Sequence, residues 1–203
     1  MIKHAFTAPS PSLCGHGSMT SFSHGKTTRT QDRLFASATL CAECGAKIVA
    51  VVPCADKGFH KMALPAMLGR PAQVKWANGI RLGFIRQLGP VMAELAKQHD
   101  PLSVAVLAVY EMLFKIQEAP FWIDNRDSKF SSYWARTEVE CLLRERLHSV
   151  ILPSAMSAFD YWNRTDYAPI RAARANIEQV REALAWSQHL PAPEQDRQPL
   201  QSV

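Results

Sequence analysis

Two short motifs near the start of the chain constrain its fold more than any other feature. The first, CGHG, supplies Cys14 and His16, and the second, CAEC, supplies Cys41 and Cys44. Two thiolates three residues apart reach one ion when the backbone turns tightly, and thiolate and imidazole ligands both suit zinc. The spacing therefore predicts a Zn²⁺ site of three cysteines and one histidine. Such a site is closed to solvent, which is typical of a structural rather than a catalytic metal.

The residues between the two motifs predict a small hairpin and a helix. The stretch SMTSFS favours a strand, HGK favours a turn, and TRTQDRLFASATL favours a short helix that returns the chain to the second motif. We expect Gly45, which follows that motif, to take the left-handed conformation that a tight turn requires. These segments together predict a zinc ribbon over residues 12–50, preceded by a flexible N-terminus at residues 1–11.

Other ligand sets and another use of the cysteines remain open at this point. His24 is an alternative to His16, and Cys54 is an alternative fourth ligand. A thioredoxin-like redox pair at the CAEC motif would need a preceding strand and a following helix within a larger α/β unit, which the sequence does not predict. Cys141 lies in a helical segment beside two leucines, where we expect a buried apolar side chain.

A linker and a helical region follow the ribbon. Prolines and glycines cluster at residues 51–70, which predicts a Pro/Gly linker. Apolar residues at helical spacing predict a helical domain of about five helices at residues 71–187, and the polar, proline-rich end predicts a mobile tail at residues 188–203. The expected fold class is mainly α, with a small N-terminal zinc ribbon (β-hairpin plus short helix) joined to a helical domain.

Within the helical domain, the boundaries follow from proline, glycine and capping residues. Gly89 and Pro90 predict a break between two helices, whereas Asp100 and Pro101 predict the start of a central core helix. Further helices are expected in the segments SKFSSYWARTEVECLLRERLHSVIL, SAMSAFDYWNRTD and APIRAARANIEQVREALAWSQ.

The charge of the chain is unevenly distributed. Residues 1–99 hold 12 Lys/Arg against 4 Asp/Glu, a balance of +8, and residues 100–203 hold 11 against 14, a balance of −3, which gives the net charge of +5. The basic half favours partners that carry phosphate or an acidic protein face. The apolar runs are shorter than the ~20 residues of a transmembrane helix, and the N-terminus has no apolar stretch of signal-peptide length. We therefore expect a cytoplasmic protein with reduced thiols and no membrane partner.

Two local motifs combine tryptophan with charged residues. WANGIR places Arg81 within a turn or so of Trp76, and FWIDNRD groups Trp122, Asp124 and Arg126 just after a helix end. Buried tryptophans with charges that satisfy one another explain such groups in structural terms. The functional interpretation is a surface pocket made by Arg81, Trp122, Asp124 and Arg126 that recognises a partner.

The order of these motifs resembles a family of poorly characterised zinc-ribbon proteins carried by bacterial phages, plasmids and integrative elements. The resemblance covers about residues 13–127 and rests on the C-G-H and C-x-E-C motifs, on LPAMLGRPAQVKWANGIR and on the W-I-D-x-R segment. The matching positions are Cys14, His16, Cys41, Cys44, Leu64, Pro65, Leu68, Gly69, Gln73, Trp76, Ala77, Ile80, Arg81, Trp122, Ile123, Asp124 and Arg126. The chain departs from the family pattern at Ala42 and Phe121, neither of which is a ligand. The resemblance implies a zinc ribbon and a mobile-element setting, but no particular activity.

The motifs of common enzymes are missing from the sequence, which predicts a non-catalytic protein. The P-loop, G-x-G-x-x-G, H-E-x-x-H and G-x-S-x-G patterns do not occur, and the expected zinc site has no open position for water. Our first expectation is an interaction protein of a mobile genetic element that binds and inhibits a host protein or nucleoprotein complex, of the kind known as anti-CRISPR. The alternative is a DNA- or RNA-binding ribbon with Lys26, Arg29, Arg33 and Lys47 on phosphates. Few aromatics accompany those cations, and Phe35 is expected to be buried, which favours the first hypothesis.

Overall fold

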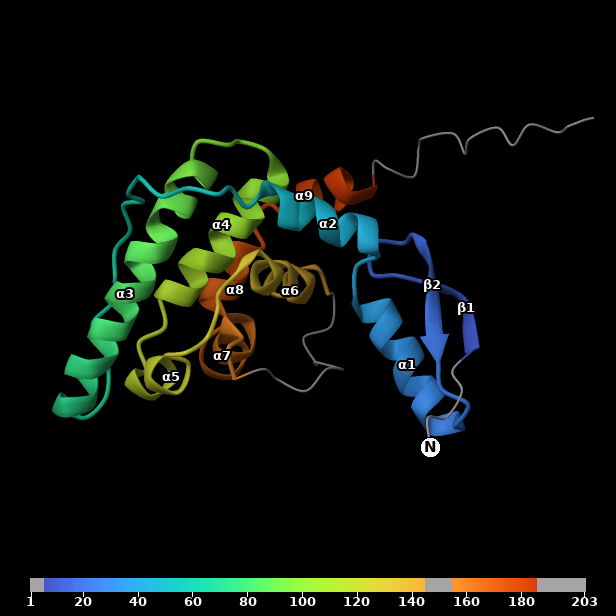
Figure 1. The fold of residues 1–203 in the computed structure, drawn as a ribbon, viewed down its shortest axis with the longest axis horizontal. Helices are drawn as coiled ribbons and strands as arrows, with labels where there is room; N and C mark the ends of the chain where they lie inside the picture. The colour runs from blue at the N-terminus through green and yellow to red at the C-terminus, as the bar shows by residue number, and fades with distance from the viewer. Residues whose placement is uncertain (1–5, 145–154, 186–203) are drawn as a thin grey trace, which may run out of the picture.

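The computed structural model describes residues 6–144 and 155–185, and it is mainly helical with one N-terminal hairpin (Figure 1). This confirms the expected fold class. The expected tail at residues 188–203, the first five residues and the end of the segment before Pro153 lie outside the described residues. The elements are β1 (Phe6–Pro11), β2 (Gly17–Phe22), α1 (Lys26–Ala38), α2 (Ala42–Val51), α3 (Pro71–Leu95), α4 (Pro101–Phe114), α5 (Ala119–Asp124), α6 (Ser132–Leu143), α7 (Ala158–Thr165), α8 (Ala168–Ala173) and α9 (Ile177–Ala185).

The hairpin and α1 form an arm, residues 6–38, that stands to one side of the helices (Figure 1). β1 and β2 pair antiparallel, and the main contacts of α1 are with these two strands. The structure corrects the expected flexible N-terminus, because residues 6–11 form β1. Pro9 and Pro11 concealed this strand in the sequence, but a two-stranded sheet has only edge strands, where the missing N–H of proline is tolerated.

α2 joins the arm to the rest of the chain, which we call the helical body (residues 71–144 and 155–185). The buried side of α2 carries Cys44 and Ile48, both fully buried, and it packs against α4 and α6. The expected ribbon therefore extends into a helix whose apolar face belongs to the core of the body.

α4 is the centre of the body and contacts α2, α3, α6, α7, α8 and α9. It begins as the sequence predicts, because the Asp100 carboxylate accepts hydrogen bonds from the amides of Leu102 and Ser103 at 3.1 and 3.0 Å, and Pro101 occupies the first turn. Most of its side chains are buried, including Tyr110 and Phe114. A helix that is apolar on nearly all sides is expected at such a central position.

α3 continues through Gly89 and Pro90, where the sequence predicted a break. The proline removes one intrahelical hydrogen bond, but its backbone angle fits a helix. Leu88 and Met92, on either side of Pro90, are both buried against the body, and this packing holds the helix together across the proline. The linker passes α3 at Gly58, which has a φ of 131° and where an added Cβ would stand 3.1 Å from the Ala93 Cβ and 3.6 Å from the Pro90 Cα.

The last part of the body has more and shorter helices than expected. The segment predicted as one helix from Ala168 is divided into α8 and α9 by a turn at residues 174–176. Arg174 at this turn donates from Nε to the Leu142 carbonyl at 2.9 Å, and Arg181 on α9 donates to the Leu143 carbonyl at 3.0 Å. The two arginines thus satisfy carbonyls at the C-terminal end of α6, where a helix has no partners of its own.

Among the described residues, no single helix is both long and apolar enough to cross a membrane. The pair α1 and α2 passes that test only when the two are taken together, and they are bent by 43° relative to one another.

Candidate metal centre

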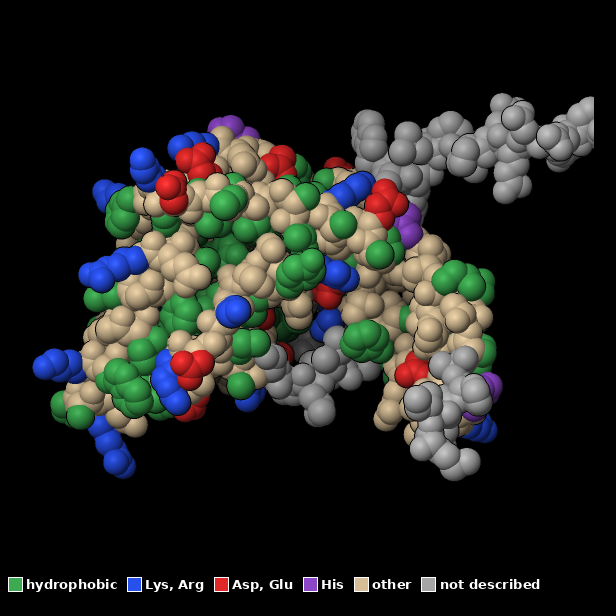
Figure 2. All heavy atoms as spheres, viewed as in Figure 1, with side chains coloured by type: hydrophobic (Ala, Val, Ile, Leu, Met, Phe, Trp, Pro, Cys, Tyr) green, Lys and Arg blue, Asp and Glu red, His purple; other side chains and the backbone are tan. Residues whose placement is uncertain are grey.

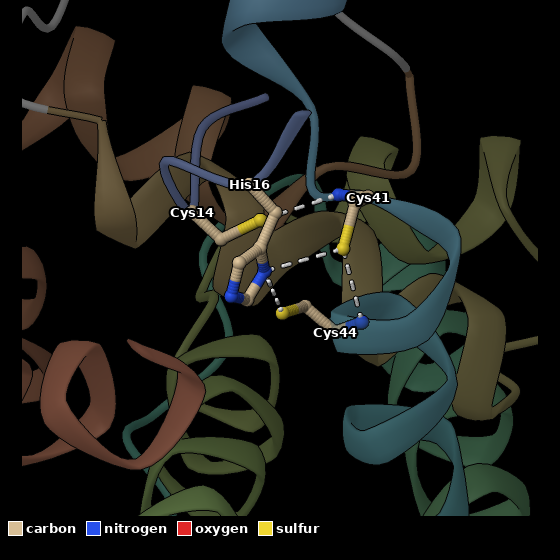
Figure 3. A group of neighbouring side chains, drawn as sticks. All are labelled: Cys14, His16, Cys41 and Cys44. Atoms are coloured by element: carbon tan, nitrogen blue, oxygen red, sulfur yellow. Dashed lines mark hydrogen bonds between the residues drawn. The ribbon is translucent and has the colours of Figure 1, made fainter. Parts of the chain in front are cut away.

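The two Cys/His motifs meet at the junction between the arm and the helical body. The Cys14, Cys41 and Cys44 sulfurs and a ring nitrogen of His16 all lie within 4.8 Å of one another (Figure 3). Cys14 and His16 come from the loop between β1 and β2, whereas Cys41 and Cys44 come from the start of α2. These four residues, which the sequence analysis selected from their spacing, form a group that could hold a metal ion.

The distances inside the group suit a tetrahedral ion. His16 Nδ1 lies 3.5 Å from the Cys41 sulfur and 3.2 Å from the Cys44 sulfur, and Figure 3 shows this nitrogen turned toward both. With metal–sulfur bonds of about 2.3 Å and metal–nitrogen bonds of about 2.0 Å, the ligand atoms of a tetrahedral site stand roughly 3.5–3.8 Å apart. Small movements would therefore bring the four atoms to ligand distance.

A tight turn positions the first pair of ligands. The amide of Ser12 donates to the His16 carbonyl and the amide of Gly15 donates to the Ser12 carbonyl, each at 2.9 Å. Gly15 has a φ of 77°, in the region that favours glycine. A further backbone hydrogen bond of 2.8 Å from Leu13 to Thr39 ties this turn to the end of α1. Backbone hydrogen bonds thus shape the loop and attach it to the chain just before α2.

The N-terminus of α2 positions the second pair. Cys41 is the N-cap residue, and its sulfur accepts a hydrogen bond from the amide of Cys44 at 3.4 Å. The amide of Cys41 points to the Cys14 sulfur at 3.5 Å. Amide donors and the positive end of a helix both stabilise negative charge on sulfur, which is useful around a cation bound by thiolates.

Gly45 serves packing and not the left-handed turn that we expected. It lies inside α2 and does not have a positive φ. A Cβ at this position would stand 2.4 Å from Cζ of the Arg136 guanidinium, which covers the glycine from α6. A larger residue here would therefore displace the Arg136 guanidinium, which explains why glycine suits this position.

The environment of the sulfurs separates their proton affinities. Burial acts to raise the pKa of Cys14, but hydrogen bonds to its sulfur, with the Cys41 amide foremost, outweigh burial and lower that pKa. Burial, followed by the neighbouring Cys41 and Cys14 sulfurs, raises the pKa of Cys44 well above its ordinary value. A metal ion bound here has to displace the proton that Cys44 keeps, so binding releases protons.

The structure separates the alternative ligands from the cluster. His24 is exposed beside the Phe6 ring, with ring centroids 5.6 Å apart, and Cys54 is exposed in the linker. Cys141 is buried on α6 as expected, and burial raises its pKa to about 12. A helix does open at the CAEC motif, but the only sheet among the described residues is the two-stranded hairpin, so the surroundings are not those of a thioredoxin-like pair.

The candidate partner-binding residues of the body do not form one surface. Trp122 is fully buried in α5, and Arg81 is 5% exposed, with its guanidinium donating to the Pro65 carbonyl and the Asn78 side chain. Asp124 and Arg126 are exposed at the end of α5. The expectation that packing buries both tryptophans of the two motifs is wrong for Trp76, which is 53% exposed on α3.

The basic residues proposed for phosphate contact are also divided. Lys26 and Arg33 are exposed on α1, whereas Lys47 is half-buried on α2. The Arg29 guanidinium donates to the His24 carbonyl at 2.9 Å and lies 5.2 Å from the centre of the Phe6 ring. Arg29 therefore holds the end of the hairpin against α1.

One group that supports the metal centre was missed in the sequence. Glu140 on α6 accepts hydrogen bonds from the Leu40 amide at 3.2 Å and from Arg136 Nε at 3.0 Å, and Arg144 Nε donates to the Ala38 carbonyl at 2.9 Å. These contacts fix the chain just before Cys41. They join residues about a hundred positions apart, and no spacing rule in a single sequence reveals them.

Comparison with known proteins adds no relative: no family model, curated protein or solved structure matches this chain.

Proposed function

We propose that the protein is a non-catalytic interaction protein that presents its arm to another protein. The observation that carries this proposal is the exposure of large apolar side chains on the arm. Met19 on β2 is 67% exposed, and Leu34 and Phe35 on α1 are 46% and 54% exposed. Phe35 was expected to be buried. Large apolar side chains exposed on a projecting element favour a protein interface, and two of these, Leu34 and Phe35, are adjacent in α1.

Zinc is the metal that this proposal assigns to the junction. Three thiolates and one imidazole nitrogen are a ligand set typical of structural Zn²⁺, and they occupy all four positions of a tetrahedral ion. No ligand position is left for a water molecule or a substrate, so the ion has no catalytic role. Its contribution is to hold the turn at Cys14 and His16 against the start of α2, and so to fix the direction in which the arm projects.

The groove between the hairpin and α1 gives the interface its shape. It has a volume of about 540 Å³ and is lined by Phe6, Ala8, Pro9, Ser10, Pro11, Phe22, Thr30, Arg33, Leu34 and Ser37. Most of these side chains are apolar, and Arg33 is the only charged one. A groove of this character suits an apolar side chain of a partner better than a row of phosphates, which supports the first expectation from the sequence over a phosphate-binding ribbon.

The sequence resemblance to proteins of mobile elements supplies the class of target. An element of this kind benefits from small proteins that block a host complex without any catalytic group. We therefore place the target in a host macromolecular complex, with a defence complex of the CRISPR type as the first candidate. The arm would act by occupying a surface that the complex needs for its own assembly or substrate.

The test is a tagged pull-down from a bacterial host with defence systems, with nuclease treatment and at low and high salt. The substitution Phe35→Asp charges the exposed face of α1, and Phe59→Asp is the matched control, because Phe59 is 75% exposed outside the arm. A captured complex is identified, purified and rebound to wild-type protein and to both variants. Zinc content and helical signal are measured for all three proteins, because an unfolded variant would be uninformative.

We expect the complex to survive nuclease and salt, and to rebind the wild type and the Phe59→Asp variant but not the Phe35→Asp variant. Recovery of nucleic acid alone, removed by salt, would contradict the proposal. Equal rebinding of both variants would show that the face of α1 around Phe35 is not the interface.

A further inference from the structure

The outer face of α3 combines positive charge, an exposed tryptophan and an open backbone. The helix buries the side that carries Ala77, Phe84 and Leu88 in the body. The opposite side is exposed and, together with the residue before the helix, we call it the α3 basic face: Arg70, Lys75, Trp76, Gly79, Leu82, Gly83 and Arg86. Within the helix these positions recur at spacings of three and four residues, so they share one side.

The stretch of chain that contains this face carries charge of a single sign. Between residues 57 and 93 the chain contains six Lys/Arg and no Asp or Glu, and Lys and Arg side chains gather along the α3 side of the molecule in Figure 2. The first acidic residue on α3 is Glu94 in its last turn, which forms an ion pair with Lys97. Arg70, Lys75 and Arg86 have no described salt bridge. A surface of this kind attracts a polyanion.

Trp76 and the two glycines add a feature that simple positive charge lacks. Trp76 is 53% exposed, an unusual position for the largest side chain unless a partner covers it. A Cβ added at Gly79 or Gly83 would meet no atom within 4 Å, so the helix surface beside Trp76 is low and open. An indole ring that stands beside a flat, basic surface can stack on an unpaired base while cations contact the phosphates.

We propose that the α3 basic face binds single-stranded nucleic acid, with Lys75, Arg86 and Arg70 on the phosphates and Trp76 stacked on a base. This surface belongs to the body and uses none of the residues of the arm, so the proposal does not depend on the proposed function. If both proposals are correct, the chain binds another protein through its arm and a nucleic-acid strand through α3, as expected for a protein that binds a nucleoprotein complex.

An anionic membrane is the other polyanion that the charge could fit, and the shape of the face argues against it. A helix that lies in a membrane surface inserts a continuous apolar stripe. The apolar side of α3 is buried in the body, and its outer face offers only Trp76 and Leu82 as large apolar groups. By contrast, stacking on single-stranded nucleic acid uses one aromatic ring for each stacked base, so Trp76 alone is sufficient for one base.

The decisive variants are Gly83→Glu and Gly83→Gln in the full chain. Both add a side chain of the same size into open space and both replace a poor helix former, so neither should unfold α3. Only the glutamate places a negative charge in the middle of the face. Binding of each protein to a fluorescently labelled single-stranded dT 20-mer is measured by anisotropy at several salt concentrations, alongside the same measurement on Trp76→Ala.

We expect Gly83→Gln to weaken binding modestly, because its side chain covers part of the open surface, and Gly83→Glu to bind roughly tenfold more weakly than Gly83→Gln, because it also adds a negative charge. Trp76→Ala should weaken it by about fivefold or more, as the loss of one stacked base does. Three phosphate contacts predict that log K falls with log salt with a slope of about −2. No binding at low salt, equal binding by the two Gly83 variants, or tighter binding to anionic lipid vesicles than to the oligonucleotide would each overturn the proposal.

Discussion

The arm and the helical body reach a fixed structure by different means. In the body, the core around α4 includes fully buried Trp122, Tyr110 and Phe114, and helices on several sides cover it. In the arm, Phe22 is the one large side chain that is almost fully buried, while Leu34 and Phe35 remain exposed. A unit of this size does not bury enough apolar surface for independent stability. A metal ion held by the Cys/His group, at the point where the arm leaves the body, is the expected substitute for a core.

This difference predicts that the arm and the body respond separately when one metal-ligating side chain is removed. The largest effect on folding is expected for Cys44→Ser. Without that sulfur the tetrahedral set is incomplete, and because metal binding supplies the folding free energy of such small units, the arm should unfold. We expect loss of bound metal and loss of hydrogen-exchange protection in residues 6–38, while most of the helical circular dichroism persists.

Cys54→Ser is the matched control, because Cys54 is an exposed cysteine outside the cluster. It should keep the metal content and the exchange protection of the wild type. Loss of the whole helical signal in Cys44→Ser would show instead that arm and body fold as one unit.

The sequence could reveal the candidate metal centre because its four residues lie in two short motifs. The spacing of CGHG and CAEC selected the four residues that the structure brings together, and it did so without any knowledge of the contacts around them. The role of Gly45 could not be predicted in the same way. Its neighbour Arg136 is distant in the sequence, so a glycine favoured by tertiary packing has the same local signature as one required by a turn.

For the body, the second largest effect is expected for Trp122→Ala. The Trp122 ring packs against Phe84 and Phe114, and its Nε1 donates to the Ile116 carbonyl at 3.0 Å. The substitution leaves a cavity and an unpaired carbonyl, with an expected loss of about 3–5 kcal/mol in the free energy of unfolding.

Trp76→Ala should change that free energy by less than about 0.5 kcal/mol, because this tryptophan is half exposed. Chemical denaturation of the metal-saturated proteins measures both values. Bound metal should stay at the wild-type level in both variants, and a loss of metal in Trp122→Ala would break the separation of the two regions.

The two tryptophans also show which features of the body the sequence could predict and which it could not. Helical periodicity located α3, α4 and α6, and Asp100 and Pro101 gave the start of α4 correctly. The same reasoning failed at Pro90 and at Trp76, because it applies average preferences of residue types. Whether a proline is tolerated or a tryptophan is covered depends on which elements pack around it, and a single sequence does not contain that information.

A smaller effect inside the body is a dependence of stability on pH through Glu138. Burial raises the pKa of Glu138 from its ordinary value near 4.5 to about 7. Hydrogen bonds from the Phe159 amide and the Ser157 hydroxyl lower this pKa, and the charge of Asp160 raises it, but burial has the largest effect. The folded state therefore binds a proton more tightly than the unfolded state between these two values. Stability from this group is greatest at pH 4.5 and below and is lost as the pH rises through 7, by about 3 kcal/mol in all.

Glu138→Gln isolates this contribution, because the amide oxygen can still accept the 2.7 Å hydrogen bond from the Phe159 amide. Denaturation of the metal-saturated protein between pH 6 and 8.5 should show a decline in stability for the wild type that is largely removed in the variant. Identical slopes for the two proteins would mean that Glu138 is charged in the folded state throughout this range.

The smallest change in the free energy of unfolding is expected for a substitution at Gly45, where the two regions meet. The sign of that change shows which group limits the space beside the glycine. Gly45→Ala places a Cβ against the Arg136 guanidinium, which has to leave its 3.0 Å ion pair with the buried Glu140 carboxylate. The expected cost of about 1–2 kcal/mol exceeds the gain of up to about 1 kcal/mol that alanine brings to a helix interior, so a small net destabilisation should remain.

In an Arg136→Met background the ion pair is already gone and the flexible methionine can move aside. The same substitution should then stabilise the protein by roughly 0.5–1 kcal/mol. A double-mutant cycle by chemical denaturation measures both values. A destabilisation of equal size in the two backgrounds would show that the backbone of α6, and not Arg136, sets the distance between the arm junction and the body.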